Sequence, residues 1–381
     1  MDYHYMTQNR TTNAPSGGRL TSLDALRGFD MLFIIGLSPL IAGICSVFPG
    51  GEGCWLAQQM DHVEWEGFRH HDTIFALFLF IAGMTFPFSL AKKRSGGWSN
   101  GRIVLDILRR MCVLILLGLV YQGIFQFNFA TQRIPSVLGR IGVAWAAAAL
   151  IYCFTGPRAQ WGIAGAILVG YFLLLKFTVA PDAPVGADSF SREGNIVYYV
   201  DRCISPNHIY WQGLGDPEGI VGTVSAVVTA MLGMFTGRYV KESKDSEGRK
   251  TIVLLIAAAV LLAAGLVWSV WYPVIKNLWT GTFVLIAAAY SVAMFAIFYY
   301  CIDVRGWKKG ATFFTVVGMN SITIYIGQSI ISFTDISRFF LGGLINVCSP
   351  AVGEVLLWAG YLGFAWLFLY FLYRHKCFLK V

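Results

Sequence analysis

The stretch MDHVEWEGFRHHDTIFALFLFIAGM, residues 60–84, joins a polar segment that holds three histidines to a long apolar run. A helix needs about 20 apolar residues to cross the ~30 Å hydrocarbon core of a bilayer. The 381-residue chain is 56% hydrophobic and 13% charged, whereas soluble domains are about 45–50% apolar and about 25% charged. These values exclude an ordinary soluble domain, so the run that begins at Asp72 predicts one span of an integral membrane protein.

Apolar runs of similar length recur along the chain, separated by short polar connections. They predict an all-α, polytopic transmembrane bundle of about ten or eleven spans, forming one domain over residues 19–381. Residues 1–18 are polar and lack the apolar core of a signal peptide, so we expect a cytoplasmic tail there. The runs lie near residues 29–48, 72–91, 103–126, 138–154, 161–179, 218–237, 251–270, 279–301, 311–333 and 352–373.

The formal net charge of +8 is distributed unevenly over the connections. Most lysines and arginines fall in the alternate connections that share a side with the N-terminus. The positive-inside rule therefore predicts that both termini are cytoplasmic, and it accounts for the basic charge without a nucleic-acid partner. The longest outer loops, 49–71 and 180–217, then carry the histidines, so we expect the chemistry to face outward.

The eight cysteines form no C-x-x-C pair, and most lie in or beside apolar runs. They are typical of small packed residues in helices. Cys54 and Cys203 are expected on the same outer side, so a disulfide between them is one arrangement that the topology allows.

His62 is the histidine with the most suggestive surroundings, since it lies between Asp61 and Glu64. A neighbouring carboxylate can orient an imidazole for catalysis or ligand binding. Asp72, at the start of the following apolar run, either caps the helix or points into a polar cavity. His70 and His71 project about 100° apart on a helix. Their spacing from His62 matches no zinc motif, so we predict no metal site.

Three further groups of polar residues could contact a ligand. Arg133 is expected on the same side as Asp216 and Glu218, where these charges could close salt bridges around a cavity or hold the hydroxyls of a sugar. Asn320 could either tie helices together or bind a ligand. The basic residues Arg27, Lys92, Lys93 and Arg94 could bind phosphate groups, although pairing of Arg27 with acidic neighbours and ordinary positive-inside charge are equally suitable explanations.

Six fragments in register resemble the transmembrane acetyltransferases related to heparan-α-glucosaminide N-acetyltransferase, and the resemblance extends from Arg19 to the end of the chain. The fragments are RLTSLDALRGFDMLFIIG, HVEWEGFRHHDTIFALFLFIAG, RIPSVLGRIGVAW, DPEGIVGTVSAVVTAMLGMFTG, KNLWTGTFVLIAAAYSVAMFA and GMNSITIYIG. The resemblance implies transfer of an acetyl group from cytosolic acetyl-CoA across the bilayer to the amine of a glucosamine. It places the family's catalytic histidine at His62, in HVEWEG, and its aspartate at Asp72.

The combined interpretation is an acetyl-CoA-dependent enzyme of a bacterial inner membrane that acetylates glucosamine or a glucosamine-terminated saccharide at the periplasmic face. His62 acts as base or acetyl acceptor, and Asp72 supports it. The expected acceptor-binding residues are Asp216, Glu218, Trp65, Arg133 and Asn320, and the expected acetyl-CoA-binding residues are Arg27, Lys92, Lys93, Arg94 and Ser38. Ser38 and Asn320 are also candidate oxyanion donors.

Two other functions remain open from the sequence. One is an O-acyltransferase that decorates a surface glycan, and the other is a sugar or lipid transporter without covalent chemistry. The expected partners are the saccharide, acetyl-CoA and membrane lipid, and a homodimer is left open.

Overall fold

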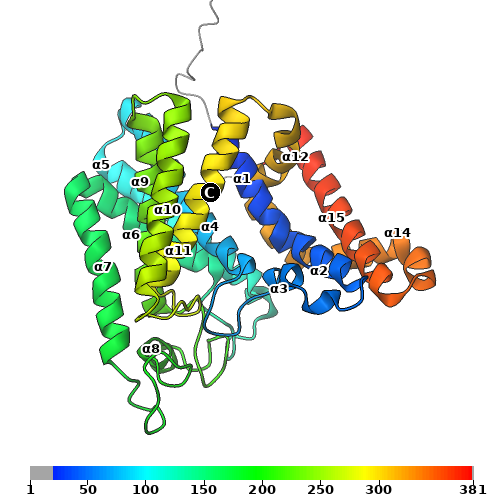
Figure 1. Cartoon of the computed structure of the whole chain (residues 1–381), viewed down its shortest axis with the longest axis horizontal. Helices are drawn as coiled ribbons and strands as arrows, with labels where there is room; N and C mark the ends of the chain where they lie inside the picture. The colour runs from blue at the N-terminus through cyan, green and yellow to red at the C-terminus, as the bar shows by residue number, and fades with distance from the viewer. Residues whose placement is uncertain (1–19, 380–381) are drawn as a thin grey trace, which may run out of the picture.

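The computed structural model describes residues 20–379, which contain helices and two isolated β-bridges but no strand (Figure 1). The predicted all-α class is therefore confirmed, while the expected tail over residues 1–18 lies outside the described residues. The helices are α1 (Thr21–Leu32), α2 (Ser38–Ser46), α3 (Trp55–Gln59), α4 (His70–Ser95), α5 (Asn100–Tyr121), α6 (Val137–Phe154), α7 (Pro157–Phe177), α8 (Ile196–Ile204), α9 (Ile220–Glu242), α10 (Glu247–Trp268), α11 (Gly281–Phe298), α12 (Lys308–Met319), α13 (Ser321–Ile330), α14 (Phe333–Val347) and α15 (Pro350–Arg374).

Eight helices between residues 20 and 379 are long and apolar enough to cross a membrane, counting α1 and α2 as one continuous helix. The pair α12 and α13, bent by 58°, could supply a ninth span. The predicted run at 103–126 corresponds to α5, which is 22 residues long but carries several charged side chains near its start. The exact number of spans and the orientation of the termini therefore stay predictions.

The two ends of the molecule differ in their connections (Figure 1). The start of α1, the α9–α10 turn and the α11–α12 connection lie at one end. The opposite end carries α8 and the long loops around it. These connections, which the charge pattern assigned to the side of the N-terminus, therefore lie together at one end of the molecule, and the long loops lie at the other.

The centre of the bundle is formed by α4 and α9, which pack backbone against backbone. A Cβ added to Gly233 would lie 2.1 Å from the carbonyl oxygen of Phe80, and one added to Gly83 would lie 2.1 Å from that of Ala230. Gly237, four residues after Gly233, is equally close to α4. Small residues spaced by four let membrane helices approach closely, so these glycines set the separation of the two central helices.

We expect Gly233→Ala to destabilise the protein by about 1–3 kcal/mol, because the added methyl group must push α4 and α9 apart. The matched control is Gly165→Ala on α7, where an added Cβ meets nothing within 4 Å. Thermal unfolding in detergent should show a lower midpoint for the first variant and an unchanged or slightly higher one for the second. Equal midpoints for both variants would contradict this account of the α4–α9 contact.

Candidate active site

The carboxylate of Asp72 lies at the start of α4, almost fully buried. Its Oδ2 accepts the backbone N–H groups of Arg69 (3.1 Å) and Val63 (3.4 Å), which holds the preceding loop against the helix. Its Oδ1 lies 2.8 Å from His62 Nδ1 and 3.4 Å from Lys276 Nζ. Asp72 therefore caps the helix and also holds His62 and Lys276, which line a cavity, although Asp72 itself is not among the described lining residues.

The imidazole of His62 is half exposed and faces the cavity, with Nδ1 bound to Asp72. Its ring centroid lies 4.4 Å from that of His71. Asp61 contacts the backbone rather than the ring, because its Oδ1 accepts the N–H of His62 at 2.7 Å. The ring is therefore positioned by Asp72, which is ten residues away, and not by its immediate neighbour in the sequence.

Lys276 completes the cluster from the loop between α10 and α11. Its Nζ lies 2.9 Å from His62 Nδ1 and 3.3 Å from His62 Nε2. Burial lowers the pKa of the Lys276 ammonium, while the carboxylates of Asp72 and Glu218 act in the opposite direction. The sequence did not single out this lysine, since 214 positions separate it from His62.

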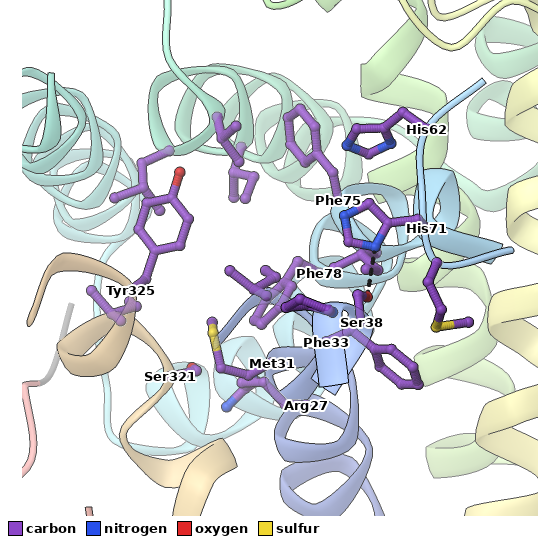
Figure 2. A pocket seen from close by; sticks show the side chains of 18 of the residues that line it. Arg27, Met31, Phe33, Ser38, His62, His71, Phe75, Phe78, Ser321 and Tyr325 are labelled. Atoms are coloured by element: carbon purple, nitrogen blue, oxygen red, sulfur yellow. Dashed lines mark hydrogen bonds between the residues drawn. The ribbon is translucent and has the colours of Figure 1, made fainter. Parts of the chain in front are cut away.

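A cavity of about 1100 Å³ begins at this cluster and continues into the bundle (Figure 2). His62, Glu218 and Lys276 line one part, and Arg27 and Arg110 line another. The helix α1 and its continuation α2 place Arg27 and Ser38 eleven positions apart, which corresponds to about 16 Å along a helix axis. The cavity therefore extends along the bundle by a distance equal to about half of a ~30 Å hydrocarbon core.

One face of α4 supplies much of the cavity wall. His71, Phe75, Phe78 and Ala82 recur at intervals of three or four residues and line the cavity, as side chains on one helical face should. The face that carries Gly83 packs against α9. Tight packing on one side of α4 thus leaves the other side open to the cavity.

The neighbouring histidines take different positions. His71 lines the cavity, and its Nδ1 lies 2.9 Å from Ser38 Oγ. His70 Nε2 instead lies 2.9 Å from the hydroxyl of Tyr290 on α11. Within residues 20–379 no group of three or more histidine, cysteine or acidic side chains is arranged to hold a metal ion.

Arg133, Asp216 and Glu218 are brought together by the structure. Arg133 binds Asp216 through two hydrogen bonds of 2.8 and 2.7 Å and also contacts Glu218. Asp216 is fully buried and further accepts the backbone N–H groups of Tyr210 and Glu218. These carboxylates raise the pKa of Arg133 against the opposing effect of its burial. Among the three, Glu218 lines the cavity.

The other predicted ligand-binding residues are not among the described residues that line the cavity. Trp65 donates its indole N–H to the carbonyl of Phe190 at 2.9 Å. Asn320 is buried at the break between α12 and α13, between lining residues Met319 and Ser321, and its Oδ1 has no partner among the described residues. Lys93 pairs with Asp106 at 2.5 Å. Lys92 and Arg94 lie with it in the last turn of α4.

These features define an integral membrane protein with a histidine–carboxylate pair at the mouth of an internal cavity. Its sequence is similar to that of heparan-alpha-glucosaminide N-acetyltransferase from Homo sapiens, with 27% identity over 365 residues, which cover 82% of this chain and 53% of the relative. The protein of that name from Mus musculus is 25% identical over 375 residues, with 84% and 55% covered. The chain is thus related to these acetyltransferases, as its fragments indicated, and spans about half their length. No family model matches the chain.

A further buried acid, Asp201 on α8, contacts the start of α9. Its Oδ1 accepts the N–H of Ile220 at 3.0 Å, whereas its Oδ2 has no partner among the described residues. Burial raises the pKa of the Asp201 carboxyl to about 6. Folding therefore favours the protonated acid, and this contribution to stability is greatest below the unfolded pKa near 4 and is lost as the pH rises through about 6.

We expect Asp201→Asn to remove this pH dependence while keeping an oxygen for Ile220. The variant should be more stable than the parent at pH 8, by up to about 3 kcal/mol, since one pKa unit corresponds to about 1.4 kcal/mol. Unfolding midpoints measured from pH 4 to pH 8 should fall less steeply for the variant, with the difference between the two proteins arising between pH 4 and pH 6. The control Asp335→Asn, at an exposed position on α14, should retain the parent's profile, and an unchanged slope in Asp201→Asn would refute the assignment.

Proposed function

We propose that the protein transfers the acetyl group of acetyl-CoA to the amine of glucosamine or of a glucosamine-terminated saccharide, from one side of a bacterial inner membrane to the periplasmic side. The observation that carries the proposal is the position of His62, which is bound to Asp72 at the mouth of a cavity that also reaches Arg27 and Arg110. A donor and an acceptor could therefore approach the imidazole from different ends. The names of the two relatives support the acetyl chemistry.

The residues at the far end of the cavity suit the phosphates of acetyl-CoA. Arginine guanidinium groups bind phosphate through paired hydrogen bonds, and Arg27 and Arg110 both line the cavity. The Arg110 Cζ lies 4.3 Å from the centroid of the Trp145 ring, and the buried Arg110 Nε has no partner among the described residues. Lys92, Lys93 and Arg94 form a basic group at the end of α4, where their charge would attract the same phosphates. Ser38 lies further along the cavity, toward the thioester.

The proposed reaction uses His62 Nε2 as the base. If Nδ1–H donates to Asp72, the Nε2 lone pair, which faces Lys276 Nζ at 3.3 Å, can take a proton from the ammonium group of the acceptor. The neutral amine nitrogen then attacks the thioester carbonyl. The C–S bond then breaks, and the leaving sulfur receives the proton that the attacking nitrogen loses as the amide forms. The Lys276 ammonium, 3.3 Å from Nε2, is placed to donate to the oxyanion formed during the attack. Direct attack of Nε2 on the thioester would instead give an acetyl-His62 intermediate, which is then transferred to the amine.

Glu218 is proposed as the residue that binds the positively charged amine, since it lines the cavity near His62. Arg133 and Asp216 support it from behind: Asp216 is fully engaged by Arg133 and by backbone N–H groups. Trp65 and Asn320 would act through the shape of the surrounding protein, because neither is among the described residues that line the cavity.

The proposal is tested by supplying purified protein with isotope-labelled acetyl-CoA and a panel of amino sugars, followed by mass spectrometry. An alkali-stable acetylated amine is the expected product. An alkali-labile ester would point to an O-acyltransferase. Absence of any acetylated product, with the saccharide nevertheless bound, would overturn the enzyme proposal in favour of a transporter.

We expect His62→Ala to lower kcat by a factor of about 10²–10⁴, the usual contribution of a positioned general base. His375→Ala, at an exposed position after α15, is the matched control and should retain parental kcat. Steady-state rates should be compared on protein whose unfolding midpoint and acetyl-CoA affinity are unchanged. Parental turnover in a folded His62→Ala variant would remove the catalytic assignment.

Lys276→Met should lower kcat by a factor of about 10²–10³ if the ammonium donates to the oxyanion. Lys276→Arg should recover part of the rate, since a cationic donor is restored. Lys176→Met serves as control, because the Lys176 Nζ lies over Phe190 outside the described cavity lining. A Lys276→Met variant with unchanged kcat and a raised KM for the amine would instead assign the lysine to acceptor binding.

A further inference from the structure

Cys45 near the end of α2 and Cys54 directly before α3 are joined by a short turn beside the cavity that His62 lines. We propose that these two cysteines form a reversible disulfide that ties α2 to α3 and so fixes the cavity wall next to His62. The proposal concerns a modification site and does not depend on the acetyl chemistry.

The chain between the two cysteines is folded into a tight turn. Phe48 N–H donates to the carbonyl of Cys45 at 3.1 Å, and Cys54 N–H donates to the carbonyl of Gly51 at 3.1 Å. Gly50 has φ of +72°, a conformation that favours glycine. A Cβ on Gly51 would lie 1.7 Å from the Cys45 carbonyl oxygen. The glycines therefore allow the close approach that returns Cys54 to Cys45.

The Cys45 and Cys54 thiols act on one another's ionisation, which places the two side chains close together. Cys54 Sγ also accepts the backbone N–H of Ala57 at 3.4 Å, and this contact lowers the pKa of the Cys54 thiol. Because the thiolate is the nucleophile in disulfide exchange, Cys54 is the sulfur that reacts first.

The oxidant required is a disulfide, either a small molecule or a protein dithiol carrier in its oxidised form. Cys54 thiolate attacks one sulfur of that disulfide and releases the first thiol. Cys45 then loses its proton and attacks Cys54 Sγ in the mixed disulfide, which releases the second thiol. The balance is two cysteine thiols and one external disulfide converted to one Cys45–Cys54 disulfide and two external thiols.

This pairing differs from the Cys54–Cys203 disulfide that the topology allowed. Cys203 lies on α8 close to Tyr199, whereas the proposal pairs Cys54 with Cys45. The two candidates differ in the segment that they would enclose, since the bridge proposed here closes a short turn.

The turn and α3 form part of the cavity wall. Ser46, Glu52, Ala57 and Met60 line the cavity, and the chain then continues directly to Asp61 and His62. A covalent bond between α2 and α3 would restrict movement of this wall, and its reduction would release it. Oxidation of Cys45 and Cys54 to the disulfide is thus expected to make the cavity wall beside His62 more rigid, and reduction is expected to make it more mobile.

Peptide mapping of the full-length protein tests the proposal. Membranes are treated with oxidised glutathione, free thiols are blocked by alkylation without reduction, and the protein is digested and analysed by mass spectrometry. A cross-linked peptide joining Cys45 and Cys54 is expected, with two more cysteines available for alkylation after treatment with a reductant. Full alkylation of both cysteines after oxidation, or a cross-link from Cys54 to Cys203, would overturn the proposal.

Matched variants separate the disulfide from general damage to the fold. Cys54→Ser should abolish the cross-link and the fall in unfolding midpoint caused by the reductant, while Cys203→Ser should leave both unchanged. Gly51→Ala should hinder the cross-link, whereas Gly53→Ala, where an added Cβ meets nothing within 4 Å, should not. A midpoint in the parent protein that ignores the reductant, or a cross-link that forms equally in Gly51→Ala, would count against the proposal. None of these measurements uses acetyl transfer, so they stand or fall separately from the proposed function.

Discussion

The buried carboxylate of Asp72 is the constraint on which the site depends. A charged group removed from water must be paired and hydrogen-bonded, and Asp72 meets that need with two backbone N–H groups, His62 and Lys276. Those partners come from the loop before α4 and from the connection between α10 and α11. One acid therefore caps a central helix, closes the loop over it and fixes the direction of the imidazole.

The cavity depends on α4, because one face of this helix packs against α9 and the opposite face lines the cavity. The glycine contacts between α4 and α9 press the two backbones together, and the opposite face of α4 borders the open space. On the other side of that space, α1 and α2 are joined through a π-helical segment in which Gly36 has φ of +137°. Ser38 follows directly and meets His71. Rigid packing on one face and an interrupted helix on the other together position polar groups inside an apolar bundle.

Much of the fold was predictable from the sequence, because the apolar runs and their polar connections reflect the low solubility of charge in lipid. The pairing of His62 with Asp72 was also accessible, since both lie in one short stretch that resembles a known family. Lys276 was not, because a single lysine in a polar loop gives no signal of a partner 214 residues away. The full engagement of Asp216 by Arg133 was equally hidden: charge indicated that they could pair, but only the packed structure shows that the acid has no free oxygen facing the cavity.

The cysteines illustrate the same limit at shorter range. Topology placed Cys54 and Cys203 on one side, but proximity was decided by the turn through Gly50 and Gly51, which returns the chain onto Cys45. The side of the membrane on which two cysteines are expected is thus a weaker guide to disulfide pairing than the local course of the backbone.

The central claim is that one cavity lets a donor and an acceptor on opposite sides of the bilayer meet at His62. Purified protein in sealed liposomes, with labelled acetyl-CoA outside and glucosamine inside, tests it most directly when the protein's orientation is determined by protease protection. The account predicts labelled N-acetylglucosamine inside the vesicles, formed by the molecules whose cytoplasmic side faces outward. Product formed only when both substrates are on the same side, or no product in either arrangement, would contradict it.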